Sequence, residues 1–259
     1  MANQRGYKVQ CNGNDFIIIN NADLKETLDD TFIQRVCDRE KGIGADGLLL
    51  INLKIDGYDF KMDYYNNDGS WETMCANGAL CAINLLQSQA YPFNYNKFLA
   101  GDGEHEFNII DDILSIRMKP PAFTTDDIKV AGHIGAHIDS GAKHFVTQSN
   151  INAMDKLHEI AQSIRYDDCF APVGLNVNFL QINNPHEINV ITYEKGIEEI
   201  MRSCGSGSVA SAFYGAQKES ISSPLTIINP GGKMKLIFND DWSEVWLTSH
   251  PTIEFEINP

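Results

Sequence analysis

Apolar and polar positions change their spacing several times along the chain, and each spacing predicts a different element. Short apolar runs at residues 15–20 (DFIIIN) and 46–53 (DGLLLINL) are typical of buried strands. Between them, residues 23–40 place four apolar side chains at helical spacing: Leu28, Phe32, Ile33 and Val36. We therefore predict a strand, a helix and a second strand in this part of the chain.

The next segment leads from a strand into a helix that begins at a cysteine. Residues 59–70 (DFKMDYYNNDGS) alternate like a strand that runs into an Asn-Asp-Gly turn. Residues 75–89 (CANGALCAINLLQSQ) then have the spacing of a helix, and its first turn holds Cys75 to Gly78. The pattern places Cys75 at the start of a helix.

The second half of the chain repeats this layout. Strand-like segments at residues 143–149, 177–184 and 187–196 come before Cys204 and a helical segment at residues 208–218. Strands that lead to a cysteine at the start of a helix therefore occur once in each half. This repetition predicts two similar domains that face each other.

Composition and charge narrow the class of protein. The chain has 259 residues, of which 43% are hydrophobic and 21% charged, as in soluble globular proteins. Its formal net charge of −15 repels polyanions, so we expect no nucleic-acid partner. The first residues lack the apolar segment of a signal peptide, and no apolar run is long enough to cross a bilayer. We expect a cytoplasmic protein with no membrane partner.

The cysteines are few and do not have the spacing of a metal site or a disulfide framework. The six are Cys11, Cys37, Cys75, Cys81, Cys169 and Cys204. No CxxC pair occurs among them, so we predict no bound metal and expect free thiols in a reducing compartment. We interpret Cys11, Cys37, Cys81 and Cys169 as structural.

Cys75 and Cys204 stand where chemistry is favoured. The first N–H groups of a helix have no partner within the helix, and together with the helix dipole they attract carboxylates and lower the pKa of a cysteine. A thiolate and a thiol on opposite sides of a carbon could remove a proton from one face and return one to the other. A single buried cysteine is more often a packing residue, but two in matching contexts favour this chemistry.

Motifs in the same order along most of the chain make it similar to the diaminopimelate epimerase family. They are GNDF at residues 13–16, CDREKGIGADGLLL at 37–50, YYNNDGSWETMCANGALC at 64–81, GAKHFV at 141–146, GLNVNF at 174–179, TYEKG at 192–196, SCGSGSVA at 203–210 and NPGG at 229–232. The resemblance implies a cofactor-independent isomerase that inverts the α-carbon of a small-molecule amino acid between two cysteines, with LL-diaminopimelate as the first expected substrate.

The resemblance also implies roles for individual residues. Its catalytic positions are Cys75, Cys204, His144 and Glu194, where His144 and Glu194 help to set the protonation of the cysteines. Its substrate-binding positions are Asn14, Asn66, Ala76, Asn77, Gly78, Asn176, Lys195, Gly205 and Ser206.

The implied fold is α+β, with two pseudo-symmetric domains that are each a curved mixed β-sheet wrapped around a central helix. A Pro-Pro pair and a polar stretch at residues 120–127 indicate the domain boundary. We expect an N-terminal domain at residues 1–119, joined by a returning C-terminal strand at 251–259, and a C-terminal domain at residues 120–250. Relatives are often dimers, so a homodimer is compatible with the resemblance.

Several positions depart from the family pattern. Where the family has glycine and arginine near the first cysteine, the chain has Ala76 and Leu80. The remaining departures are Ala142, Lys143, Lys195 in place of an arginine that grips the distal carboxylate, Ile200 and Met201. A lysine keeps the charge but cannot form the bidentate contact of an arginine. Racemisation of another amino acid such as histidine, isomerisation of a non-amino acid, and ligand binding without catalysis therefore stay as alternatives.

Overall fold

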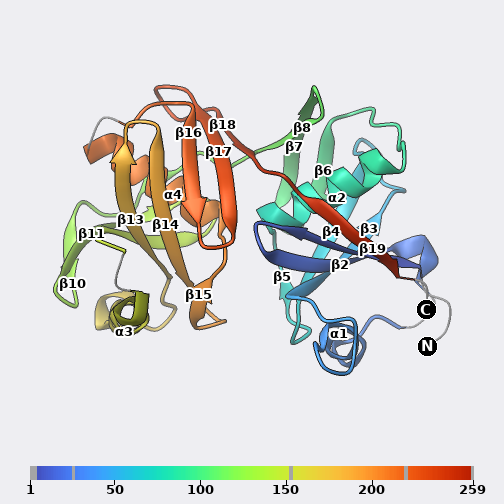
Figure 1. Ribbon diagram of the computed structural model, residues 1–259, viewed down its shortest axis with the longest axis horizontal. Coiled ribbons are helices and arrows are strands. Elements are labelled where there is room, and N and C mark those ends of the chain that lie inside the picture. The colour runs from blue at the N-terminus through green and yellow to red at the C-terminus, as the bar shows by residue number, and fades with distance from the viewer. Residues whose placement is uncertain (1–4, 25–26, 152–153, 219–220, 258–259) are drawn as a thin grey trace. The chain divides into compact units, whose positions relative to one another are not determined.

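The chain forms two compact units, which a computed structural model describes for residues 5–24, 27–151, 154–218 and 221–257 (Figure 1). Unit 1 comprises Met1–Ile116 and Ser249–Pro259, and unit 2 comprises Arg117–Thr248. The sequence placed the boundary after residue 119 and the return of the chain at residue 251. Each unit therefore carries one of the two cysteines that begin a predicted helix.

Unit 1 contains a mixed sheet. Its strands are β1 (Gly6–Cys11), β2 (Asn14–Asn20), β3 (Gly47–Asn52), β4 (Phe60–Asn66), β5 (Trp71–Glu72), β6 (Lys97–Ala100), β7 (Gly103–Ile110), β8 (Ile113–Arg117) and β19 (Thr252–Ile257). Strand β1 pairs antiparallel with both β2 and β19, so the C-terminal strand joins the N-terminal sheet. β2 runs parallel to β3 and β4 runs parallel to β6, whereas the other pairs are antiparallel.

Unit 2 contains a second mixed sheet. Its strands are β9 (Ala122–Phe123), β10 (Ile128–Val130), β11 (His133–Asp139), β12 (Lys143–Gln148), β13 (Asn176–Asn184), β14 (Glu187–Glu194), β15 (Glu199–Met201), β16 (Leu225–Asn229), β17 (Gly232–Phe238) and β18 (Val245–Thr248). β12 runs parallel to β13 and β14 runs parallel to β16. The other pairs within the unit are antiparallel.

The two sheets have the same connectivity. From β1 to β8 the successive pairings are antiparallel, parallel, antiparallel, antiparallel, parallel, antiparallel and antiparallel. The pairings from β11 to β18 follow the same order. The helices also fall at equivalent places: α1 (Asp30–Cys37) and α3 (Met154–Arg165) follow the second strand of each series, and α2 (Ala76–Ser88) and α4 (Gly205–Lys218) follow the fifth.

α2 and α4 are the central helices of their units. All residues from Ala79 to Ile83 have 0% exposure, and α2 contacts β1, β2, β3 and β19. α4 contacts β11, β12, β13 and β14, and its residues Val209, Ala210 and Ala212 are also fully buried. A helix with apolar residues around its circumference is stable when protein surrounds it. The predicted α+β class, with a sheet wrapped around a central helix, is confirmed.

The helix predicted at residues 23–40 is shorter in the structure. A short 3-10 helix η1 occupies Asn21–Asp23, and α1 begins at Asp30 because the Asp29 carboxylate accepts the backbone N–H of Phe32 at 2.8 Å. Leu28 therefore precedes the helix, although it still packs beside Phe32 and Val36. Apolar spacing predicted the buried face correctly, while the cap fixed the start. Neither α3 nor the 3-10 helix η2 (Asp168–Phe170) was predicted from the sequence.

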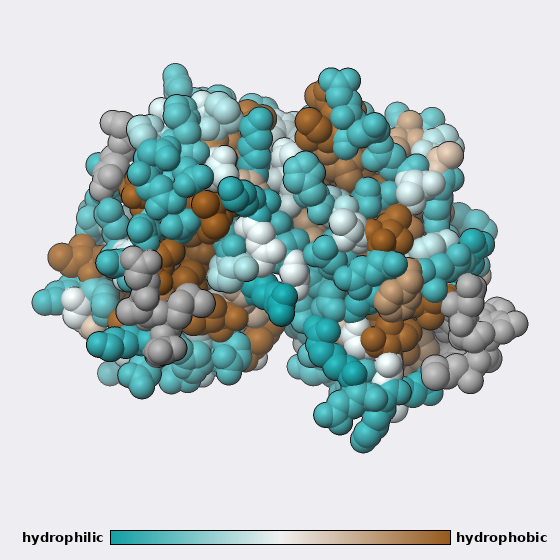
Figure 2. Space-filling view, in the orientation of Figure 1, coloured by the Kyte–Doolittle hydropathy of each residue, from teal (hydrophilic) through white to brown (hydrophobic). Residues whose placement is uncertain are grey.

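The face of the molecule drawn in Figure 2 is largely hydrophilic. Small apolar groups interrupt the hydrophilic residues on this face. Scattered exposed apolar side chains are normal for soluble domains. Among the described residues, no helix has the length and apolar character needed to cross a membrane.

Candidate active site

Cys75 is the N-cap residue of α2. Its backbone is extended, with φ −135° and ψ 118°, and its carbonyl oxygen accepts the N–H of Ala79 at 2.9 Å. The sulfur does not cap the helix; it lies 3.7 Å from Oδ1 of Asn14, to which the thiol donates. Nδ2 of Asn77 donates to the same oxygen at 3.4 Å. Unit 1 therefore brings together a thiol, two amide side chains and a helix start.

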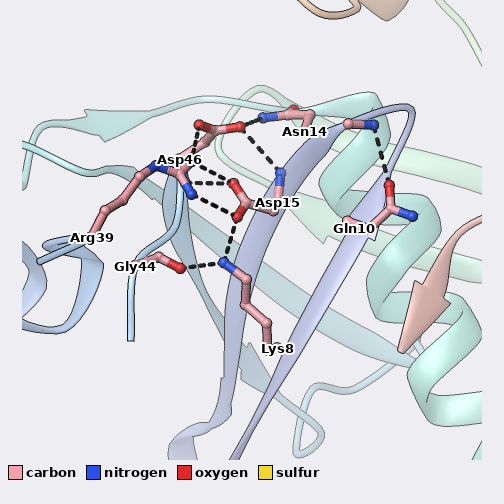
Figure 3. Close-up of polar contacts among 8 residues, drawn as sticks. Lys8, Gln10, Asn14, Asp15, Arg39, Gly44 and Asp46 are labelled. Carbon is pink, nitrogen blue, oxygen red and sulfur yellow. Dashed lines mark hydrogen bonds and ion pairs between the residues drawn. The ribbon is translucent and has the colours of Figure 1, made fainter. Parts of the chain in front are cut away.

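Asp46 holds Asn14 from the other side. Its Oδ2 accepts Nδ2 of Asn14 at 2.8 Å and the backbone N–H of Asp15 at 3.1 Å, as Figure 3 shows. Asn14 is 7% exposed, so the oxygen and the NH₂ group of its side chain both need a hydrogen-bond partner within the protein. Asp46 was not among the predicted site residues, although it stands within the GIGADG segment of a family motif.

Cys204 precedes α4 and differs from Cys75 in the hydrogen bond of its sulfur. The sulfur accepts the backbone N–H of Gly207 at 3.4 Å and lies 3.5 Å from Oγ of Ser206. Burial, and then the negative charge of Glu194, raise the pKa of Cys204 to about 11. The N–H donor favours the thiolate, but burial outweighs it, so the thiol is the resting form without ligand.

His144 is fully buried beside Ser206. Its Nδ1 lies 2.7 Å from Oδ1 of Asn178, and its Nε2 lies 3.0 Å from Oγ of Ser206. Nδ2 of Asn178 donates to Oγ1 of Thr192 at 2.8 Å, which turns the Asn178 oxygen toward the histidine. Nδ1 must then carry the proton, and Nε2 accepts from the serine hydroxyl. Burial lowers the pKa of His144 to about 4, so the ring is neutral at pH 7.

Glu194 is the last residue of β14, and the turn that follows the strand carries Lys195. Oδ1 of Asn176 accepts the backbone N–H of Lys195 at 2.8 Å. Oε1 of Glu198 accepts the N–H of Gly196 at 3.0 Å and also Nη2 of Arg165 at 2.9 Å. The turn is therefore fixed at both ends by side chains from β13 and α3.

Within each unit, the structure joins some predicted residues and separates others. Unit 2 connects Cys204, Ser206 and His144 through hydrogen-bonding distances, with Glu194 in electrostatic range of the thiol. Asn66, in contrast, is the last residue of β4, at the start of a hairpin, where its Oδ1 accepts from the Tyr64 hydroxyl at 2.8 Å and its Nδ2 donates to Ser70 at 3.1 Å. Its amide is engaged by this hairpin.

Two departures from the family motifs belong to packed interiors. Leu80 is 0% exposed in α2, so its side chain belongs to the packing around this helix. Ile200 in β15 pairs with Tyr193 and packs against the apolar cluster of unit 2. Met201 pairs with Thr192 and is partly exposed.

The remaining cysteines are mostly structural. Cys11, Cys37 and Cys81 are buried, and burial raises the pKa of Cys37 to about 12 and that of Cys81 well above its usual value. Cys169 is exposed in η2, so our interpretation of it as a structural residue was wrong. Its pKa is raised to about 11, by partial burial and by Asp167, which disfavours a reactive thiolate there.

Sequence reasoning missed four residues that support the predicted ones. Asp46 holds Asn14, Asn178 and Thr192 orient His144, and the buried Ser140 donates its hydroxyl to the carbonyl oxygen of Ser206 at 2.8 Å. Asp46, Asn178 and Thr192 stand in the quoted motifs, which is the one signal that could have found them. Their contacts depend on strand pairing and are not periodic in sequence.

Comparisons with known proteins agree with this architecture. The family model described as diaminopimelate epimerase matches residues 6–117. The chain is 36% identical over 239 residues to a diaminopimelate epimerase of Flavobacterium psychrophilum, with 91% of each chain covered. It is 33% identical over 271 residues to a diaminopimelate epimerase of Aquifex aeolicus, with 96% of this chain and 95% of that protein covered.

Solved structures resemble the fold at much lower identity. A phenazine biosynthesis protein of the PhzF family from Bacillus anthracis superimposes with a TM-score of 0.74 at 11% identity, covering 100% of this chain and 99% of that one. A hydroxyproline epimerase from Agrobacterium vitis gives 0.69 at 13% identity, covering 98% and 90%. These likenesses concern the fold.

Proposed function

Because the chain belongs to the diaminopimelate epimerase family, we propose that it is an isomerase that converts LL-diaminopimelate to meso-diaminopimelate without a cofactor. One observation carries this proposal. Cys75 and Cys204 occupy equivalent places in two units of identical connectivity, each directly before a buried central helix. Such a pair supplies the two proton-transfer groups that inversion of a carbon requires.

The proposed reaction moves one proton off the α-carbon and another onto it. A thiolate takes the α-proton from one face, and the electron pair that remains on carbon spreads into the α-carboxylate. The second cysteine, as a thiol, then donates its proton to the opposite face and becomes the thiolate. The backbone N–H groups at the starts of α2 and α4, including those of Ala76, Gly78, Gly205 and Ser206, would stabilise the charge on the carboxylate.

Cys204 must lose its proton before it can act as a base. A path exists in the hydrogen bonds of unit 2, from the sulfur to Oγ of Ser206 and on to Nε2 of His144. The high pKa of Cys204 and the low pKa of His144 both favour the neutral pair. We infer that substrate binding alters these two pKa values, because a positive charge near the sulfur would favour the thiolate.

Lys195 bears on which side chain the substrate carries. In the family, an arginine binds the distal carboxylate, and Lys195 takes its place here. Asn176 and Glu198 hold the turn that carries Lys195, so the ammonium group is offered from a fixed backbone. The ammonium group of Lys195 can bind one oxygen of a distal carboxylate. Diaminopimelate carries such a carboxylate, so it stays the favoured substrate. Racemisation of a different amino acid is the second candidate, favoured by the missing bidentate fork.

The proposed activity also implies where the protein acts and which small molecule it binds. We propose a cytoplasmic location, as fits an enzyme of lysine and peptidoglycan precursor synthesis, and an amino acid as the small-molecule partner. In this proposal the N-terminal domain carries the catalytic Cys75 and the C-terminal domain carries the catalytic Cys204. A homodimer is compatible with the proposal. Sedimentation of the purified chain would decide its oligomeric state.

Solvent exchange tests the reaction directly. LL-diaminopimelate incubated in D₂O should gain deuterium at the α-position and form the meso isomer. Cys75→Ala and Cys204→Ala should each abolish this conversion, whereas Cys169→Ala should retain it, because that thiol is exposed and lies outside the proposed machinery. Turnover of another free amino acid, with none of diaminopimelate, would favour the second candidate. Normal conversion to the meso isomer in either catalytic variant would refute the two-cysteine mechanism.

A further inference from the structure

The amide of Asn14 lies between a carboxylate and a thiol. Asp46, directly before β3, accepts Nδ2 of Asn14 at 2.8 Å (Figure 3). On the other side, Oδ1 of Asn14 lies 3.7 Å from the sulfur of Cys75. A carboxylate has only acceptors, so Asn14 must present its NH₂ group to Asp46. The carbonyl oxygen then points the other way, toward Cys75.

This orientation passes on to the next amides. Oδ1 of Asn14 also accepts Nδ2 of Asn77 at 3.4 Å, and Oδ1 of Asn77 lies 3.5 Å from Nδ2 of Asn12. Nδ2 of Asn12 donates to Oγ of Ser249 at 2.8 Å. Each amide donates toward the oxygen of the one before it, so a carboxylate at one end sets the direction of the whole chain.

Two basic residues surround the carboxylate end. Nη2 of Arg39 lies 2.7 Å from Asp46 and 2.8 Å from Asp15, and the buried Lys8 binds Asp15 and the carbonyl oxygen of Gly44. Although burial opposes its ionisation, hydrogen bonds from Arg39 and Lys8 hold the pKa of Asp15 well below its usual range. The negative charges of Asp15 and Asp46 are therefore matched by the positive charges of Lys8 and Arg39, and Arg39 is the ionic partner of Asp46.

We propose that Asp46 is a positioning residue for Cys75: by fixing the Asn14 amide, it keeps a hydrogen-bond acceptor on the sulfur and holds Cys75 as the thiol before reaction. The inference rests on the proposed role of Cys75 in catalysis. A thiol donates to a carbonyl oxygen, whereas a thiolate would be repelled by it, so the fixed amide favours the protonated form. Cys75 is then the acid in the first turnover, and Cys204, whose sulfur accepts the Gly207 N–H, becomes the base once substrate binding has removed its proton.

An Asp46→Asn substitution breaks the direction without changing the size of the side chain. An asparagine there can meet Asn14 with either its oxygen or its NH₂ group, so Asn14 can turn its own NH₂ group toward the sulfur. A donor in place of an acceptor stabilises the thiolate. We expect the thiolate fraction of Cys75 near neutral pH to rise at least about threefold. Cys81, which interacts electrostatically with Cys75, stays unchanged in this variant.

Alkylation by iodoacetamide measures this fraction in the ligand-free protein. Its rate at the Cys75 peptide, followed by mass spectrometry between pH 6 and pH 10, should shift to lower pH in Asp46→Asn. The matched control is Arg39→Gln, which removes an ionic partner of Asp46 but leaves its contact with Asn14, and it should titrate as the wild type does. Asn14→Ala should shift Cys75 in the same direction, and adding Asp46→Asn to it should change nothing further.

The outcomes separate this inference from the proposed function. An unchanged Cys75 profile in a folded Asp46→Asn protein, or an equal shift in Arg39→Gln, would overturn the positioning role. If Asp46→Asn does not fold, an unchanged profile in Asn14→Ala would overturn it as well. Alkylation needs no substrate, so a failure to turn over diaminopimelate would refute the proposed function without altering this result. A shifted profile together with at least a tenfold loss of kcat in Asp46→Asn would support both.

Discussion

Replacing the buried His144 with glutamine should remove a pH-dependent part of the stability of unit 2. His144 is 0% exposed and neutral, with Nδ1 bound to Asn178 and Nε2 to Ser206. Glutamine offers one donor and one acceptor of similar reach but does not titrate. The substitution therefore separates the proton-binding property of the imidazole from its place in the hydrogen-bond chain.

The size of the effect follows from the pKa of His144, which burial lowers from 6.5 to about 4. Below pH 6.5 the unfolded chain binds a proton that the folded protein does not, so stability is fully present above this pH and is lost as the pH falls toward 4. The loss between pH 7 and pH 5 is about 2 kcal/mol, since each pKa unit is worth about 1.4 kcal/mol. His144→Gln should lack this slope.

Urea unfolding followed by tryptophan fluorescence can report on unit 2 separately. A Trp71→Phe background removes the tryptophan of unit 1 and leaves Trp242 and Trp246, both in unit 2. The free energy of unfolding, taken at pH 5, 6 and 7, gives a slope for each protein. The pKa of His137 is also lowered by burial, but this residue is present in both proteins and cancels in the comparison.

Equal slopes in the two proteins would refute the reasoning, because they would mean that folded His144 binds its proton as readily as the unfolded chain does. A uniform offset between the two curves would report only the fit of glutamine. Asp15 does not confuse the measurement, since it belongs to unit 1 and its low pKa places its titration below this range.

Three further substitutions test buried contacts within the two units. Leu80→Ala should lower stability by about 2–5 kcal/mol by leaving a cavity and should leave KM unchanged, because Leu80 is fully buried; a raised KM would place position 80 at the substrate. Gly207→Ala should reduce kcat at least tenfold, since a Cβ there would come within 2.4 Å of Nδ2 of Asn178; combining it with Asn178→Ala should add little, and full additivity would contradict this cause. Asp59→Asn should lower the free energy of unfolding by about 2 kcal/mol, because the Asp59 carboxylate accepts the N–H groups of Asn94 and Tyr95. Urea unfolding followed by the fluorescence of Trp71 measures this change, and an unchanged stability would contradict the prediction.

The sequence by itself determined the central elements and the location of the thiols. Apolar runs at residues 15–20 and 46–53 correspond to β2 and β3, and the helical patterns at 75–89 and 208–218 correspond to α2 and α4. These patterns are local, because the backbone geometry of a helix sets the spacing of its buried residues and a buried strand is a short apolar run. The family motifs then selected Cys75 and Cys204 among six cysteines.

Only the tertiary structure decided how the side chains around these thiols are oriented. Asp46 reaches Asn14 because β2 and β3 run parallel with Phe16 opposite Gly47, and His144 reaches Asn178 because β12 and β13 run parallel with His144 opposite Asn176. Pairing between distant strands brings such residues together, and no spacing along the chain encodes it. The direction of an amide, the tautomer of a buried histidine and the acceptor on a thiol follow from those contacts, which is why sequence located the two cysteines but could not tell their hydrogen bonds apart.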